Sequence, residues 1–328
     1  MDDFLFSLNA VMPIVLLVVL GYILKKIKLF TAEFLRVANK LTFNVLLPTL
    51  LFSNVYAIKS FSDIQWSFVL YAITAIAIIF ALSVPLYIGL TKNNAQRGVL
   101  IQASYRSNYA IIGIPLASQL FGEKGAAAAS VLSAFSIPLF NVLAVVSLSI
   151  FNKDTENRPK IGKIISGIIK NPLIIGVVTG IACLGIRGIF EHEGINFRLS
   201  DVSFLQTSLK YIASTATPVA LLVLGGQFEF SAVKSLKKQI IFGTVMRTVI
   251  VPALCLTTAK IILPDLGGEC FAAFVALFGT PVAVSSAIMA REMNADYDLA
   301  GQLVVWTTIV SSFTLFITIV IFRYLGVF

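Results

Sequence analysis

Charged side chains are scarce in this sequence. They make up 12% of its 328 residues, whereas hydrophobic residues make up 58%. A soluble globular domain carries about 25% charged residues, so the chain has about half of the charge that a water-exposed surface requires. This shortage excludes a secreted soluble protein, a nucleic-acid-binding protein and a soluble enzyme. It predicts an all-α polytopic membrane protein.

Histidine and cysteine are rare as well. The only histidine, His192, lies in the polar sequence Glu-His-Glu, and the three cysteines have no Cys-x-x-Cys spacing. These counts predict neither a disulfide framework nor a metal site, and no pattern in the chain indicates a cofactor. The first apolar run follows Asp2 and Asp3 instead of basic residues. It is therefore interpreted as a retained span and not as a signal peptide.

Apolar stretches of transmembrane length recur along the chain. A membrane-spanning helix needs about 20 mostly apolar residues, and ten stretches meet this requirement. They are 4–24, 41–58, 66–90, 98–121, 126–151, 172–190, 204–227, 240–263, 270–291 and 299–322. The longest polar connection separates five of them from the other five. We therefore predict a first five-helix repeat over 1–151, a linker over 152–171 and a second five-helix repeat over 172–328.

Lysine and arginine are unevenly distributed between the connections. With the N-terminus placed outside, the cytoplasmic connections contain 16 of them and the outer connections contain 6. Because positive residues accumulate on the cytoplasmic side, this asymmetry predicts a multi-pass protein of the cell membrane with both termini outside and a cytoplasmic linker. The net charge of +9 is interpreted as a topology signal, strengthened by contact with anionic membrane lipid.

Prolines occur in the same order in the two sets of spans, and four of the five span pairs share one. The pairs are Pro13 with Pro172, Pro48 with Pro218, Pro85 with Pro252, and Pro115 with Pro281. Because each set has an odd number of spans, the two sets must have opposite orientations, which predicts a 5+5 inverted repeat. This architecture is typical of secondary transporters, in which two inverted halves give inward-facing and outward-facing states of similar energy.

Glycine and proline interrupt the fourth and ninth spans near their centres, in Gly113-Ile114-Pro115 and Gly279-Thr280-Pro281. Proline removes a helical hydrogen bond and clashes with the preceding turn. We therefore predict that both helices are broken and cross here, with Thr280 capping the second half-helix. Two half-helix N-termini would then direct N–H groups at one midplane site for an anion. The alternative is a simple proline kink, which is common in membrane helices.

Acidic residues are absent from the centres of the spans, because all 16 lie in connections or at span ends. This absence disfavours a carboxylate-pair cation antiporter and an intramembrane enzyme. Two arginines do lie within spans. Arg106 either attracts an anionic substrate or extends its head group to the cytoplasmic edge, and the sequence leaves both alternatives open. For Arg247 the second alternative is favoured.

Uncharged polar residues lie close to the two predicted breaks. Asn108 lies two turns before the proline of the fourth span and is a candidate donor to a substrate carboxylate. Asn44, Ser285 and Ser286 are further candidates. The alternative for each is a hydrogen bond between helices, which is the favoured interpretation for Asn141.

Three segments resemble the auxin efflux carrier family, which contains plant auxin carriers and bacterial malate- and malonate-type permeases. Residues 108–116, Asn-Tyr-Ala-Ile-Ile-Gly-Ile-Pro-Leu, are similar to its Asn-x4-Gly-Ile-Pro-Leu motif. Residues 216–225 are similar to its Pro-x-Ala-Leu-x-x-Leu-Gly pattern, and residues 290–294 are similar to Ala-Lys-Glu-Tyr-Asn. The resemblance extends over essentially the whole chain.

This resemblance implies a ten-span fold with crossing, broken helices four and nine. It implies a scaffold of spans 1, 2, 6 and 7, a mobile transport domain of spans 3–5 and 8–10, and a homodimer through the scaffold. Asn108 would contact the substrate carboxylate at the crossing of Pro115 and Pro281. Ser286 stands where plant members have a second proline, and the central loop is short. A small bacterial-type carboxylate is therefore expected rather than auxin.

The sequence thus predicts a carrier and not an enzyme. Small organic anions, malate-like, malonate-like or auxin-like, would cross by alternating access in secondary-active or facilitated transport. The alternative is a sodium-coupled symporter of the bile-acid type, which sodium-dependent uptake would distinguish. The predicted substrate-binding residues are Asn44, Arg106, Asn108, Gly113, Ile114, Pro115, Gly279, Thr280, Pro281, Ser285 and Ser286.

Overall fold

The computed structural model describes residues 2–56, 65–151, 166, 169–195, 197–228 and 231–327. Helices dominate these residues, and none of the described segments forms a β-strand. Six described helical stretches are long and apolar enough to cross a membrane. They are Trp66–Leu90, Tyr109–Ile150, Pro172–His192, Ser203–Gln227, Val233–Ile262 and Tyr297–Tyr324. The prediction of an all-α polytopic membrane protein is therefore confirmed.

The chain forms two series of helices, and most of the predicted linker between them, 152–171, lies outside the described residues. The first series is α1 (Asp2–Lys26), α2 (Ala32–Leu41), η1 (Thr42–Leu46), α3 (Leu47–Tyr56), α4 (Trp66–Leu90), α5 (Asn94–Tyr105), η2 (Tyr109–Gly113) and α6 (Ile114–Ile150). The second series is α8 (Pro172–His192), η3 (Leu199–Asp201), α9 (Ser203–Gln227), α10 (Ser231–Val245), η4 (Met246–Ile250), α11 (Val251–Ile262), α12 (Gly268–Gly279), α13 (Ser285–Glu292) and α14 (Tyr297–Tyr324).

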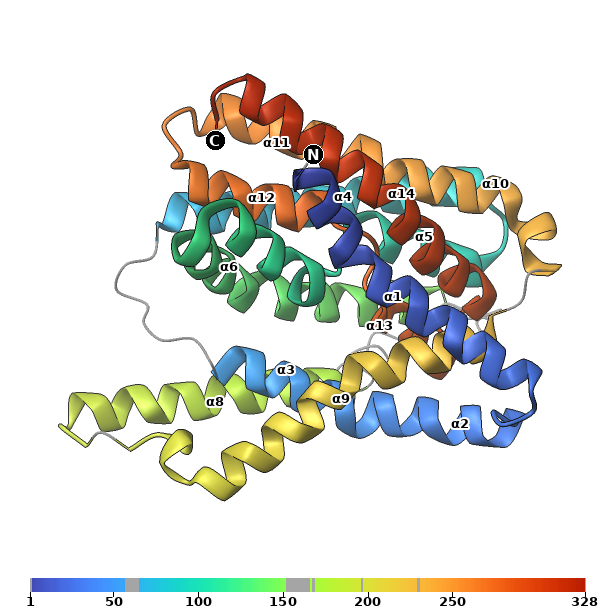
Figure 1. Ribbon diagram of the computed structural model, residues 1–328, viewed down its shortest axis with the longest axis horizontal. Coiled ribbons are helices and arrows are strands. Elements are labelled where there is room, and N and C mark those ends of the chain that lie inside the picture. Colours follow the sequence, from blue (N-terminus) through green and yellow to red (C-terminus); the bar gives the residue numbers. More distant parts are fainter. Residues whose placement is uncertain are drawn as a thin grey trace.

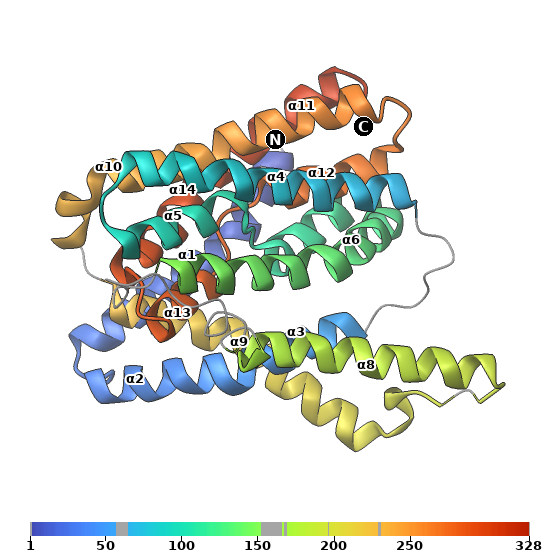
Figure 2. The same ribbon diagram turned by 180° about the vertical axis from the view of Figure 1, so that it is seen from behind.

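The helices form two layers, which Figures 1 and 2 show from opposite sides. In the lower layer of both views α3 packs against α8 and α9, and α2 packs against α9. In the upper layer α12 packs against α6, α4 against α5, and α10 against α14. α1 contacts α9 of the lower layer and α14 of the upper layer. Buried apolar residues from both layers form one continuous core.

Glycines allow the backbones of α1 and α9 to touch. A Cβ atom on Gly21 of α1 would overlap the carbonyl oxygen of Leu222, and a Cβ atom on Gly225 of α9 would overlap the carbonyl oxygen of Val18. Any larger residue at either position would force the two helices apart. Small residues of this kind are typical of helix contacts in membranes, because lipid gives apolar side chains no drive to associate and close packing must supply the attraction.

Three prolines are accommodated by π-helical turns and do not break their helices. Pro48, Pro115 and Pro252 are each the second residue of an α-helix that follows η1, η2 or η4. In each case the backbone N–H group of the residue before the proline donates a hydrogen bond to the carbonyl five residues earlier, as Ile114 does to Tyr109. The wider turn relieves the clash of the proline ring with the preceding carbonyls and removes the need for the missing N–H group.

The ninth predicted span is interrupted where the sequence predicts a break. α12 ends at Gly279, and α13 begins at Ser285. Thr280 and Pro281 therefore begin a short non-helical segment. Thr280 is extended, as expected for a residue before proline, because the proline ring disfavours the helical conformation of the preceding residue.

The fourth predicted span is interrupted earlier than the sequence predicts. α5 ends at Tyr105, residues 106–108 are not helical, and η2 continues into α6 without a gap. The predicted break at Gly113-Ile114-Pro115 is therefore wrong, because the π turn of η2 lets the helix pass through the proline. The predicted fourth and fifth spans are joined by a sharp bend within α6 at Gly122, whose φ of 55° suits glycine.

Candidate functional site

The two interrupted segments meet and pair through their backbones. Ser107, between α5 and η2, forms an isolated antiparallel bridge with Val282, between α12 and α13. The N–H group of Asn108 donates to the carbonyl of Pro281 at 2.8 Å. Backbone polar groups that leave a helix inside a membrane protein must find such partners, because lipid offers none. The pairing therefore allows both helices to unwind at the same place.

Arg247 of η4 lies beside this crossing and is completely buried. At the end of α12 its guanidinium donates to the carbonyl oxygens of Thr280 at 2.9 Å and Leu277 at 3.0 Å. At the end of α5 it donates to the carbonyl oxygens of Ser104 and Tyr105, both at 3.4 Å. The expectation that Arg247 extends to the cytoplasmic edge is wrong, because the ends of two helices hold its head group in the interior.

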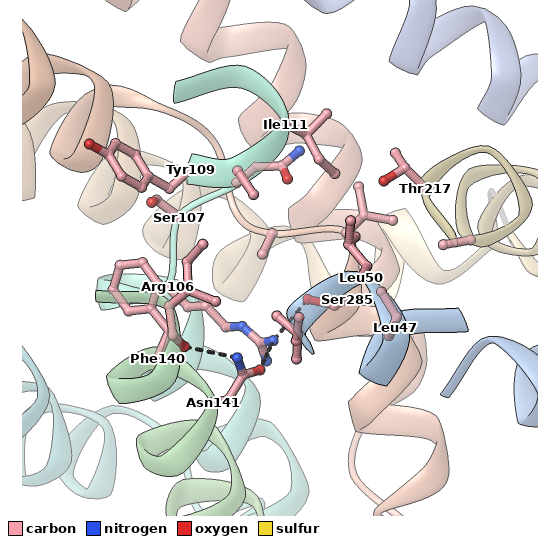
Figure 3. A pocket seen from close by; sticks show the side chains of 17 residues that line it. Leu47, Leu50, Arg106, Ser107, Tyr109, Ile111, Phe140, Asn141, Thr217 and Ser285 are labelled. Atoms are coloured by element: carbon pink, nitrogen blue, oxygen red, sulfur yellow. Dashed lines mark hydrogen bonds between the residues drawn. The ribbon is translucent and has the colours of Figure 1, made fainter. Parts of the chain in front are cut away.

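A cavity of about 60 Å³ lies at the crossing (Figure 3). This is about twice the volume that one water molecule takes up in the liquid. Its walls come from α3, α6, α9, η2 and the two unwound segments. The lining residues are Leu47, Leu50, Leu51, Arg106, Ser107, Asn108, Tyr109, Ala110, Ile111, Ile137, Phe140, Asn141, Thr217, Ala220, Ala283, Val284 and Ser285.

Arg106 supplies the charge of this cavity. Its side chain is buried, and its guanidinium donates to Oδ1 of Asn141 and Oγ of Ser285, both at 2.8 Å, and to Oε1 of Gln102 at 3.2 Å. Figure 3 shows the guanidinium directed at Asn141 and Ser285. All of these partners are neutral, and no acidic residue occurs among the described residues that line the cavity. Arg106 therefore does not extend to the membrane edge, and its positive charge has no counter-ion in the cavity.

Three further polar groups of the cavity have unused hydrogen-bonding capacity, and one of them is the buried hydroxyl of Tyr109. The side-chain amide nitrogen of Asn108 and the hydroxyl of Ser107 are buried and have no hydrogen-bond partner among the described residues. Buried polar groups are nearly always paired, so each unpaired one needs an explanation. Together with Arg106, these groups place hydrogen-bond donors on the wall of the cavity.

Most of the remaining cavity wall is apolar. Leu47 and Leu50 approach from α3, and Ile137 and Phe140 of α6 line the wall as well (Figure 3). Ligand sites of this kind bind the apolar body of a molecule with aliphatic and aromatic side chains and fix its orientation with a few polar groups. The arrangement suits a small organic anion better than a hydrated inorganic ion.

The residues of the first predicted break do not line the cavity. Gly113 packs against the ring of Tyr109, which a Cβ atom at this position would overlap. Ile114 begins α6, and Pro115 is exposed on the surface of that helix. The helix instead presents the preceding turn, residues 109–111, to the cavity.

The second break contributes Ser285 to the cavity, whereas Gly279, Thr280 and Pro281 are buried and do not line it. The hydroxyl of Thr280 donates to the carbonyl of Ala276 at 2.8 Å. The predicted capping of the following half-helix by Thr280 is therefore wrong. A threonine hydroxyl readily donates to the carbonyl four residues earlier in its own helix, and this local bond prevails here.

Two other candidates lie outside the cavity. Ser286 is buried, and its carbonyl accepts a hydrogen bond from the amide of Gln102 at 3.2 Å. Asn44 is exposed, and its amide donates to the carbonyl of Lys40 at 2.8 Å. Of the predicted set, the structure brings three residues together in the cavity: Arg106, Asn108 and Ser285.

The polar cavity residues that are absent from the predicted set are Ser107, Tyr109, Asn141 and Thr217. Asn141 accepts a hydrogen bond from Arg106 and donates to the carbonyl of Ile137 at 2.8 Å. The sequence assigns it to contacts between helices, although a lone amide in an apolar span is also a signal for a site. Thr217 of α9 faces the cavity from the opposite side (Figure 3). It directly precedes Pro218 in the segment 216–225, which is similar to a motif of the auxin efflux carriers. This position in the motif is the sequence signal that could have identified Thr217 as a site residue.

The fold and the cavity define a class of protein. Interrupted helices that cross inside a helical membrane protein and leave a buried charged cavity are typical of solute carriers. Residues 6–319 match the family described as "Membrane transport protein". The chain therefore belongs to this family, and its resemblance to the auxin efflux carriers is confirmed.

Two archaeal relatives are similar over most of the chain. An uncharacterized transporter of Methanothermobacter thermautotrophicus is 24% identical over 323 residues, which are 94% of this chain and 96% of the relative. An uncharacterized transporter of Methanocaldococcus jannaschii is 24% identical over 259 residues, which are 78% of this chain and 80% of the relative. Family and relatives alike are transporters, so the chain is a multi-pass membrane transport protein.

Proposed function

We propose that the protein carries small organic anions and binds the substrate carboxylate between Arg106 and Asn108. The observation that supports this most directly is the buried Arg106 guanidinium, whose partners among the described residues are all neutral. A carboxylate would supply the missing negative charge through charge-assisted hydrogen bonds. The unpaired amide of Asn108, in the same cavity, would donate to the same carboxylate.

The size and the wall of the cavity limit the substrate. A volume of about 60 Å³ admits a short carboxylate in this conformation, and a larger dicarboxylate such as malate would require the cavity to widen. One cationic side chain and no acidic side chain line the described cavity. This balance favours an anion and gives a transported cation no counter-charge.

The architecture we propose is ten spans in a 5+5 inverted repeat. Three apolar segments would add to the six long helical stretches: α1, α2 with α3, and α12 with α13. The remaining span would be formed by α5, η2 and the part of α6 before the bend at Gly122, and the part of α6 after the bend would cross separately. In such a repeat the first and sixth spans are equivalent, as are the second and seventh. The contact of α1 with α9 is matched by the contact of α8 with α3, and this reciprocity supports the repeat.

The cavity lies where the two layers meet, which supports alternating access. Leu50 and Thr217 reach it from α3 and α9 of the lower layer, whereas Asn141 reaches it from α6 of the upper layer and Arg106 directly follows α5 of that layer. We propose that the lower layer with α1 is the scaffold and that the upper layer moves against it and exposes the site to each side in turn. Both termini would face outside, and a homodimer would form through the scaffold.

The experiment that tests this function is a thermal-unfolding screen of the purified protein followed by uptake into proteoliposomes. Short mono- and dicarboxylates are added with sodium or choline as the cation. We expect at least one carboxylate to raise the unfolding midpoint, since a ligand that binds only the folded state stabilises it, and the same compound to be taken up. Stabilisation by amines or sugars, with no response to any carboxylate, would contradict the proposal. Uptake that requires sodium would favour the sodium-coupled symporter.

A further inference from the structure

Arg247 has an environment that the proposed anion site does not explain. It does not line the cavity, and it is completely buried. Its guanidinium is surrounded by four backbone carbonyl oxygens, two from the end of α5 and two from the end of α12, at 2.9 to 3.4 Å. The last carbonyls of any helix lack partners within that helix. Arg247 therefore satisfies the ends of both interrupted helices at once.

The charges in this cluster balance without a carboxylate. Each helix C-terminus carries about half of a negative charge, so the ends of α5 and α12 together offset the single positive charge of the guanidinium. No ion pair of Arg247 with an acidic side chain occurs among the described residues. The binding partners of this cation are thus backbone carbonyls alone.

Backbone carbonyls at the ends of unwound helices are also the groups with which many secondary carriers bind a coupling cation. In such carriers the ion enters and leaves in each transport cycle. Here the carbonyls of the two interrupted helices already hold a cation that is covalently part of η4. The described residues also contain no group of three or more histidine, cysteine or acidic side chains that would hold a metal ion elsewhere.

We propose that Arg247 is a tethered replacement for a coupling cation, which holds the two interrupted helices together in every state and makes transport independent of sodium. The second part of this proposal rests on the proposed anion transport. The first part does not, because it concerns the helix ends themselves. Arg247 is a positioning residue, since it acts on the cavity through the backbone of the crossing segments.

The first measurement is the unfolding midpoint of purified protein in choline chloride, sodium chloride and methylguanidinium chloride at equal millimolar concentration. The variants are Arg247→Ala, Arg247→Lys and, as a control, Arg36→Ala, which removes an exposed arginine of α2. We expect the wild type and the control to have equal midpoints in sodium and choline. Arg247→Ala should have a lower midpoint in choline, and sodium or methylguanidinium should raise it by about 3 °C or more, since either cation then binds to the vacated carbonyls.

The second measurement is uptake of the carboxylate identified by the screen. Wild-type uptake should be the same with sodium and choline. In choline, uptake by Arg247→Ala should fall at least tenfold, and methylguanidinium or sodium should restore part of it. Arg247→Lys, which keeps the charge but has fewer donors, should transport without sodium and unfold at a lower temperature than the wild type. If Arg247→Ala does not fold, the uptake and the unfolding midpoint of Arg247→Lys test the proposal instead.

Two results would overturn the proposal. One is wild-type uptake that increases severalfold with sodium, and the other is an Arg247→Ala midpoint that equals the wild type and is the same in all three salts. Failure of the proposed function has a different signature, because no carboxylate would then be transported by the wild type. The salt response of the Arg247→Ala midpoint needs no substrate and would still decide the role of Arg247.

Discussion

Replacing Arg106 with glutamine removes the single charge of the cavity and keeps a polar side chain of similar reach. In the proposed complex the guanidinium makes a charge-assisted hydrogen bond with the substrate carboxylate, and such bonds contribute about 1.5–3 kcal/mol. Because about 1.4 kcal/mol corresponds to a factor of ten in affinity, Arg106→Gln should raise the apparent substrate constant about 10- to 150-fold. Uptake into proteoliposomes over a range of substrate concentrations measures this constant.

Stability separates this effect from misfolding. A buried arginine costs at least about 2.5 kcal/mol in a membrane helix, whereas glutamine can keep one of the hydrogen bonds to Asn141 or Ser285. The unfolding midpoint of Arg106→Gln should therefore stay close to that of the wild type. Arg36→Gln is the matched control, because it removes a positive charge from a side chain that is 64% exposed and outside the cavity. An apparent constant within twofold of the wild type, in a folded Arg106→Gln protein, would refute the assignment of Arg106 to the substrate.

Three further changes test other parts of the structure. Asn108→Asp puts a negative charge beside the carboxylate site and should reduce uptake more than Asn108→Ala does; equal activity of the two variants would contradict a donor role. Pro115→Ala should leave the unfolding midpoint unchanged or higher and reduce uptake less than twofold, because the helix already passes through Pro115. A loss of uptake as large as that of Asn108→Ala would contradict this expectation and would show that Pro115 is needed for transport. Cysteines replacing Lys237 and Asp265, both exposed, should react with an impermeant thiol reagent from opposite sides of the membrane; in intact cells, reaction at position 237 would reverse the proposed orientation.

The membrane class and the break at Gly279-Thr280-Pro281 follow from the sequence because both depend on local properties. A shortage of charge is a property of composition, and a glycine followed closely by a proline is a local signal for the end of a helix. The same reasoning fails at Pro115, because a π turn is not encoded by the proline itself. Pro48 and Pro252 are accommodated in the same way. A proline inside an apolar span therefore indicates that the helix is distorted, but it does not tell whether the helix forms a π turn or breaks.

The roles of the two arginines depend on partners that are distant in sequence. Arg247 contacts Thr280, 33 residues away, and Tyr105, 142 residues away. The sequence-based interpretation counts only the residues between Arg247 and the cytoplasmic edge of its span. Because this count ignores such partners, it wrongly predicts that the head group of Arg247 extends to that edge. Asn108 begins a recognisable motif and Arg106 lies two residues before it, so the sequence indicates this segment although it leaves the role of Arg106 open. Their meeting with Ser285 nevertheless depends on the pairing of two segments that lie about half of the chain apart.

The crossing places two buried arginines close together, and their partners determine that only one of them is available to a ligand. The donors of Arg247 are directed to carbonyls of the backbone, which cannot turn away without unwinding α5 or α12 further. The donors of Arg106 are directed to the side chains of Asn141 and Ser285, which can rotate and accept or donate elsewhere. A carboxylate that enters the cavity therefore has to displace only side-chain hydrogen bonds to reach Arg106. Exchange of the two roles would require rebuilding of the helix ends, which supports the proposal that Arg106 binds the ligand and that Arg247 holds the crossing together.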